Sequence, residues 1–163
     1  MSQAQFLLWL EGSGLGQFTR SLGVWSYGTI NLIHILGITA LFGSILLLDL
    51  RLLGAWRQVP LAVLSGPTTF MARIGFALAV CSGIPMLSVN AGEYIGNPFL
   101  LVKFPAIGLA LLNVLLVHRS QAWRAHRVRE LMPRERLRLA LGAALSLTFW
   151  LTAITGGRML GYW

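Results

Sequence analysis

The chain has 163 residues, of which 56% are hydrophobic and only 11% are charged. Soluble domains carry about 25% charged residues, so this composition indicates an integral membrane protein without a separate soluble catalytic domain. The formal net charge is +8, but the cations stand beside apolar stretches, which favours membrane topology over nucleic-acid binding as their explanation. The single cysteine, Cys81, excludes an intrachain disulfide and a Cys-x-x-Cys motif.

The first 22 residues predict an interfacial segment. They mix apolar side chains such as Phe6 with polar ones such as Arg20. This mixture is typical of an amphipathic helix that lies in the membrane interface, here interrupted at the Gly-Ser-Gly sequence of residues 12–14. The alternative is a disordered tail that leads into the first span.

Four apolar stretches follow, each long enough to cross a bilayer, which takes about 20 residues of helix. The first contains no charged side chain for the 28 residues between Arg20 and Asp49, unless His34 is protonated. The predicted spans cover residues 25–50, 66–90, 98–118 and 139–160. The sequence therefore predicts an all-α fold, a four-helix transmembrane bundle that forms a single domain over residues 1–163.

The cations are distributed unequally between the two sides of this bundle. The loops after the first and third spans hold nine arginines, whereas the other side holds three cations, Arg20, Lys103 and Arg158. Basic residues in short loops remain in the cytoplasm. We therefore expect a multi-pass protein of a bacterial inner membrane with both termini in the periplasm.

Ionisable and polar residues inside the spans are the candidate functional residues, because they are costly in hydrocarbon and usually face the bundle interior. His34 is the central candidate, and Asn31 and Gly37 share its helical face. Gly37 leaves space beside the histidine for a close neighbour, which could be a helix or a flat cofactor. By helical rise, His34 and His118 differ in depth by about 15–20 Å.

A b-type haem would use the following residues in the outer half of the bundle. His34 offers an imidazole for the iron, and Met86 offers a thioether as a second axial ligand. Lys103 and Arg158 lie at a similar height and could neutralise the propionates. The candidate cofactor-binding residues are therefore His34, Lys103, Arg158, Met86, Asn31 and His118, with His34 as the metal ligand.

Each candidate also has a structural interpretation. His34 could be a hydrogen-bonded packing residue, and His118, followed by Arg119, could be an interfacial residue. The Lys103 side chain could extend along the helix to place its ammonium group at the outer surface. We expect Cys81 and the methionines to be packing residues.

Three stretches of the chain carry a resemblance to a known family. They read IHILGITALFGSILLLDLRLLG, GNPFLLVKFPAIGLALLNVLLVHR and LTAITGGRMLGYW. They resemble a family of four-span bacterial membrane proteins of unknown function, over most of the chain from about Ser26. More loosely, a histidine close to a glycine, with a DLRLLG-type end, resembles the copper-resistance D membrane domain and small b-type cytochromes. The resemblance implies a four-helix fold and no specific activity.

Three functions are consistent with these features. The first is a haem-bearing electron carrier between the membrane quinone pool and a periplasmic redox partner. The second is a non-catalytic anchor or assembly subunit of a larger membrane complex, or a homo-oligomer, which glycine-rich helix faces would suit. The third is metal handling or transport. Whether the protein is an enzyme stays open, although no nucleophile–base pair, phosphate loop or thiolate metal site is visible.

Overall fold

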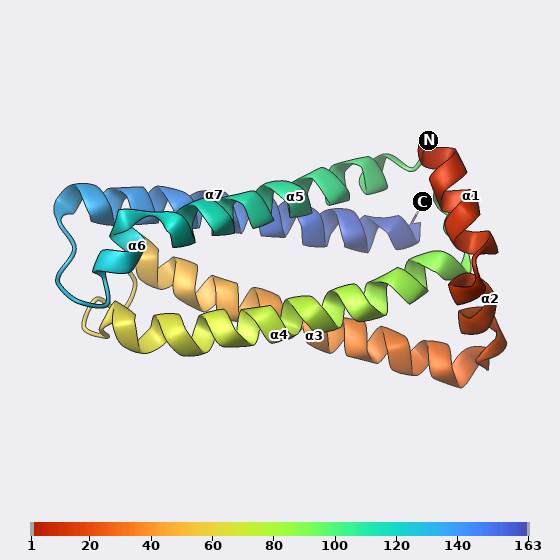
Figure 1. The fold of residues 1–163 in the computed structure, drawn as a ribbon, viewed down its shortest axis with the longest axis horizontal. Coiled ribbons are helices and arrows are strands. Elements are labelled where there is room, and N and C mark those ends of the chain that lie inside the picture. The colour runs from red at the N-terminus through yellow and green to blue at the C-terminus, as the bar shows by residue number, and fades with distance from the viewer. Residues whose placement is uncertain (1, 163) are drawn as a thin grey trace. The chain divides into compact units, whose positions relative to one another are not determined.

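The computed structural model describes residues 2–162; Met1 and Trp163 lie outside the described residues. Within the described part of the chain, all regular elements are helical (Figure 1). The elements are α1 (Gln3–Gly12), α2 (Gly14–Ser21), α3 (Gly23–Leu53), α4 (Leu61–Val89), η1 (Ala91–Tyr94), α5 (Pro98–Arg119), α6 (Gln121–Ala125), α7 (Pro133–Met159) and η2 (Leu160–Tyr162).

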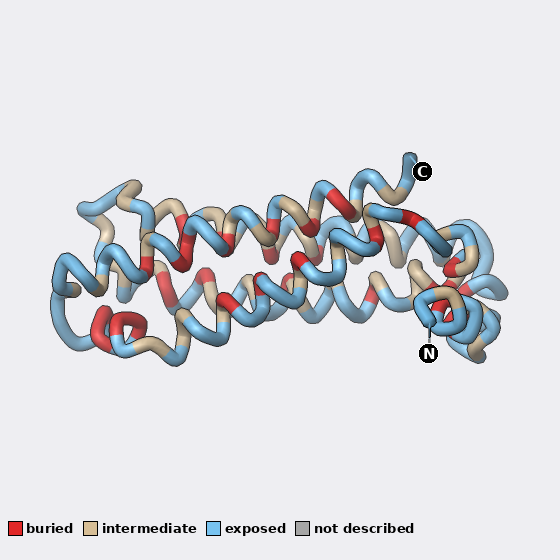
Figure 2. Tube along the Cα trace, turned by 90° about the horizontal axis from the view of Figure 1, so that it is seen from above, coloured by how far each residue is buried: buried red, intermediate tan, exposed pale blue. Residues whose placement is uncertain are grey.

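Four of these helices, α3, α4, α5 and α7, are long and apolar enough to cross a membrane. In the most apolar window of each, only 11% to 33% of the residues are buried inside the protein. The other residues of these helices are intermediate or exposed (Figure 2), and such apolar surface is compatible with lipid contact. The predicted all-α four-helix fold and the multi-pass class are therefore confirmed.

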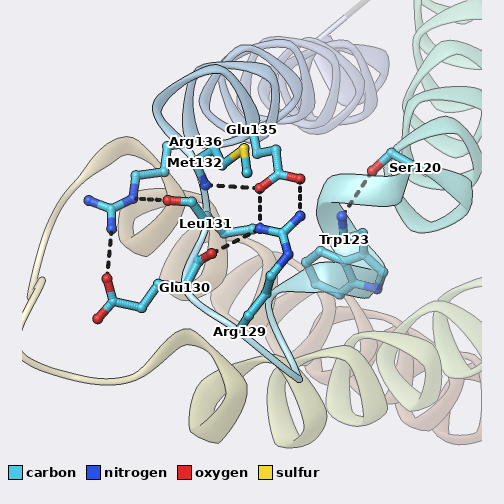
Figure 3. Close-up of polar contacts among 8 residues, drawn as sticks. All are labelled: Ser120, Trp123, Arg129, Glu130, Leu131, Met132, Glu135 and Arg136. Carbon is cyan, nitrogen blue, oxygen red and sulfur yellow. Dashed lines mark hydrogen bonds and ion pairs between the residues drawn. The ribbon is translucent and has the colours of Figure 1, made fainter.

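The ends of two spans differ from the predicted ones. Helix α7 begins at Pro133, six residues before the predicted start, because proline suits the first turn and the Met132 N–H donates to the Glu135 carboxylate over 2.8 Å (Figure 3). Helix α4 begins at Leu61, directly after Pro60, rather than at residue 66. Both helices thus extend beyond the apolar stretches from which they were predicted.

The N-terminal segment is a pair of helices, α1 and α2, so the alternative of a disordered tail is wrong for the described residues. The break lies at Ser13, as predicted, and its hydroxyl accepts a hydrogen bond from Gly16 N–H over 3.2 Å at the start of α2. The carboxylate of Glu11 accepts from Gly92 N–H over 2.5 Å. Arg20 donates to the carbonyl of Val89 over 2.7 Å. The pair is therefore attached to η1 and the end of α4; its place in the membrane interface stays a prediction.

The helices form two compact units. The first comprises Met1–Leu41 and Arg73–Pro98, and so holds α1, α2, η1, the beginning of α3 and the end of α4. The second comprises Phe42–Ala72 and Phe99–Trp163, and so holds the rest of α3 and α4 together with α5, α6 and α7.

In the second unit, α5 and α7 run antiparallel beside each other (Figure 1). The side-chain amide of Asn113 donates to the carbonyl of Gly142 over 2.9 Å, which joins the two helices inside the unit. Ala122 and Trp123 of α6 pack with Leu139 of α7 as a small buried core. The short helix α6 is therefore an integral part of this unit.

Candidate functional site

His34 lies on α3 in the first unit, and its imidazole faces Ser82 of α4. The His34 Nδ1 atom is 3.0 Å from the Ser82 hydroxyl oxygen, and that hydroxyl is 2.5 Å from the carbonyl of Leu78. A hydroxyl has a single hydrogen. When Ser82 donates this hydrogen to Leu78, it can only accept from His34, so Nδ1 carries the proton. The lone pair of the imidazole then resides on Nε2.

Glycines allow α3 and α4 to approach closely enough for this contact. A Cβ atom added to Gly83 would lie 2.9 Å from the His34 Cε1 atom. One turn further along α3, a Cβ atom on Gly37 would lie 2.8 Å from the backbone nitrogen of Ala79. The close neighbour predicted for Gly37 is therefore a helix, and the space at this position is filled by the backbone of α4.

The contacts between α3 and α4 also define their register. Gly37 faces Ala79, and His34 faces Ser82 and Gly83. Because the two helices are antiparallel, the same register places Asn31 opposite Met86, one turn further toward the N-terminal helices. Both side chains are half-buried. Three predicted site residues, His34, Asn31 and Met86, thus belong to one helix pair of the first unit.

Lys103 and Arg158 belong to the second unit. The Lys103 side chain extends along the glycines of α7, and a Cβ atom on Gly157 would lie 3.4 Å from its Nζ atom. Arg158 donates to the Tyr162 hydroxyl, and its guanidinium carbon lies 4.8 Å from the centre of the Tyr162 ring. Lys103 is half-buried and Arg158 is exposed. Their proposed role beside His34 stays a prediction.

The rings of the other two histidines contact the Trp123 ring at tilted angles of 48° and 57°, an arrangement that the sequence did not indicate. The ring centres of His118 and His126 lie 4.5 Å and 4.6 Å from that of Trp123. The His118 Nδ1 atom is also 2.9 Å from the carbonyl of Val114 in its own helix. These contacts at the end of α5 support the structural interpretation of His118.

His126 is buried, with 7% of its surface exposed, although its sequence position suggested a basic loop. Its Nε2 atom lies 2.9 Å from the Ser65 hydroxyl at the start of α4. Burial lowers the pKa of His126 below its ordinary value of 6.5. The sequence contained one signal of this arrangement: Ser120, a good N-cap residue, precedes a short run of alanine and tryptophan.

Asp49 is a second polar residue that the predicted site did not include. It is 5% exposed, and Ser146 of α7 donates a hydrogen bond to it. Its Oδ2 atom is buried without a hydrogen-bond partner among residues 2–162. Within the same range, no three histidine, cysteine or acidic side chains come together in a way that could hold a bare metal ion.

Comparisons with known proteins identify one match. The model of a family of unknown function, DUF6644, matches residues 6–163. No curated protein and no solved structure match the chain.

Proposed function

The chain belongs to this DUF6644 family of unknown function, and we propose that it is a membrane-embedded electron-transfer subunit with b-type haem bound through His34. The observation that carries the proposal is the contact between the His34 Nδ1 atom and the Ser82 hydroxyl, which places the ring proton on Nδ1 when Ser82 donates to Leu78. A metal-binding histidine commonly donates its second ring N–H to a neighbouring oxygen, which orients the ring and makes the ligand more basic. Ser82 is in the position to supply that oxygen.

The residues around His34 would hold its ring in place as an iron ligand. Gly83 supplies a flat backbone surface against which the imidazole packs, since any Cβ atom there would collide with the ring. Met86 follows Ser82 by four residues on the same face of α4, and a thioether is a common second axial ligand of haem iron. The haem, when bound, supplies one-electron redox chemistry.

The chain itself holds this ligand in a fixed position. The backbones of α3 and α4 are in contact at Gly37 and Gly75, where a Cβ atom on Gly75 would lie 2.7 Å from the Gly37 carbonyl oxygen. A rigid crossing limits movement of the His34 ring. We propose that electrons pass between the quinone pool and a redox protein on the side of the N-terminal helices, the periplasmic side according to the cation distribution.

An anchor or assembly subunit is the second candidate. Glycines at positions 28, 43 and 108 lie on membrane-spanning helices with open space at their Cα atoms. Small residues on lipid-facing helices permit close contacts with another helix. Native mass spectrometry in mild detergent would test this candidate, and it predicts an oligomer or a co-purifying partner, whereas a monomer alone would contradict it.

An absorption spectrum of the purified, dithionite-reduced protein tests the haem proposal. We expect a Soret band with sharp α and β bands, and we expect the His34→Ala variant to insert into the membrane without them. His126→Gln is the matched control, because it also removes one imidazole, is not a candidate ligand and can still bond to Ser65. A colourless wild-type protein, or equal haem content in all three proteins, would contradict the proposal.

A further inference from the structure

A cavity of about 750 Å³ lies in the second unit, apart from His34. Its lining comes from the end of α3, the α3–α4 loop, the start of α4, the α6–α7 loop and the start of α7. Three of the membrane-spanning helices therefore end at this cavity. Such a position corresponds to the depth of the lipid head groups.

The polar lining of the cavity is strongly cationic. Five arginines and one glutamate contribute to it: Arg51, Arg57, Arg127, Arg129, Arg136 and Glu130. The guanidinium group of Arg129 is already neutralised, because it donates to both oxygens of Glu135 over 2.8 Å and 2.7 Å (Figure 3). Arg136 and Glu130 are 3.8 Å apart, and their side chains are 63% and 96% exposed. An ion pair between such exposed side chains contributes little to the stability of the fold.

Hydrogen bonds to backbone carbonyls position two of these arginines, and a third lies against a glycine. Arg51 donates to the carbonyls of Val59 and Arg57 over 2.8 Å and 3.3 Å. The Arg57 side chain lies against Gly54, whose φ of +115° requires glycine and where a Cβ atom would lie 3.0 Å from an Arg57 nitrogen. Arg136 donates to the carbonyl of Leu131 over 3.0 Å.

Arg51, Arg57 and Arg136 carry like charges and line the same cavity. Among residues 2–162, no carboxylate lies within ion-pair distance of Arg51 or Arg57. The positioned cations thus form a site whose charge an anion would compensate.

We propose that this cavity binds a phosphate group through Arg51, Arg57 and Arg136. A phosphate offers several acceptor oxygens to guanidinium groups, which bind it with paired hydrogen bonds. Leucines at positions 52, 53, 61, 131, 137 and 139 also line the cavity and could contact acyl chains. The phosphate can therefore come from an anionic phospholipid head group or from the aqueous phase, and both share this chemistry.

The test compares two variants of equal charge in the full-length protein. The double variant R57Q/R136Q removes two cations from the cavity lining. The matched control R134Q/R138Q also removes two cations. Both lie near the start of α7, as Arg136 does, but neither lines the cavity. The single variant R57Q serves if the double variant melts too early for measurement.

Native mass spectrometry compares how much phosphatidylglycerol and how much phosphatidylcholine each protein retains. Thermal melting compares the melting temperature in inorganic phosphate with that in chloride at equal ionic strength. Arginines near a membrane surface contribute about fivefold each to anionic binding, so R57Q/R136Q should bind phosphatidylglycerol about 25-fold more weakly. The control should bind as the wild type does.

The outcomes separate the two sources of phosphate. Selective loss of phosphatidylglycerol in R57Q/R136Q supports a lipid site. A melting shift with inorganic phosphate that only R57Q/R136Q loses, without preference for phosphatidylglycerol, supports a site for a soluble phosphate. The proposal is overturned if both double variants lose phosphate binding equally. It is also overturned if the wild type prefers neither phosphatidylglycerol to phosphatidylcholine nor inorganic phosphate to chloride.

Discussion

The Nδ1 atom of His34 on α3 lies 3.0 Å from the hydroxyl oxygen of Ser82 on α4, and the same hydroxyl lies 2.5 Å from the carbonyl of Leu78. Ser82 therefore links a histidine within a membrane-spanning segment to the backbone of the neighbouring helix. Because a buried polar group without a partner costs about 1–3 kcal/mol, this bond explains how His34 is tolerated there. When Ser82 donates to Leu78, the His34 ring proton lies on Nδ1, on which the proposed iron ligation depends.

Removal of the Ser82 hydroxyl tests this relationship. In Ser82→Ala, Nδ1 loses its acceptor, so we expect haem affinity to fall about 10-fold to 100-fold, as for other residues that orient a metal ligand. The reduction potential should rise, because the imidazole becomes less basic. Titration with haem and redox potentiometry measure both effects. Ser88→Ala is the control, since its hydroxyl donates to the carbonyl of Pro85 in its own helix; equal effects in both variants would contradict the role proposed for Ser82.

The close crossing of α3 and α4 predicts that one added methyl group lowers the stability of the protein. In Gly75→Ala, the new Cβ atom would overlap the backbone nitrogen of Leu41 and the carbonyl of Gly37. Such overpacking costs about 1–3 kcal/mol. In Gly43→Ala, on the same helix pair, the new methyl group meets open space. Thermal melting in detergent should show destabilisation of the first variant alone, and similar melting of both would argue against the close crossing.

The burial of His126 predicts a pH dependence of stability. Burial lowers the pKa of His126 in the folded protein, and the charges of Arg127 and His118 act in the same direction. Below pH 6.5 the unfolded chain therefore binds more protons at this site than the folded protein does. The stability from neutral His126 is fully present above pH 6.5 and is lost as the pH falls from there toward the folded pKa.

Unfolding free energies of the wild type and His126→Gln, measured in detergent across this pH range, check the expectation. Glutamine can still bond to Ser65 but does not titrate, so the advantage of the wild type over the variant should shrink as the pH falls. A constant difference between the two proteins would show that His126 titrates equally in the folded and unfolded states.

The cation distribution predicts the orientation of the chain. A periplasmic reporter fused after residue 163 should be active, whereas the same reporter inserted between Val128 and Arg129 should be inactive, because arginines keep the α6–α7 loop in the cytoplasm. A cytoplasmic reporter should give the opposite pattern at both positions. Reversed activities would place the arginine cavity on the outer side of the membrane.

The sequence by itself determined the class and the succession of elements. Hydropathy is a local property, because each span must satisfy its own backbone hydrogen bonds inside the bilayer. The uncharged stretch after Arg20, the break near Ser13 and the start of a helix at Pro98 could therefore be read without knowledge of any neighbour.

Only the tertiary structure decided which faces of the helices meet. The sequence placed Gly37 beside His34 but did not distinguish a helix from a cofactor as its neighbour. A glycine leaves space without determining what fills it. The burial of His126 depends on Ser65, 61 positions away in the chain. The arginine cavity likewise requires loops that are distant in sequence to converge. Such contacts depend on the rotation and register of packed helices, which apolar surfaces facing lipid on several sides do not specify.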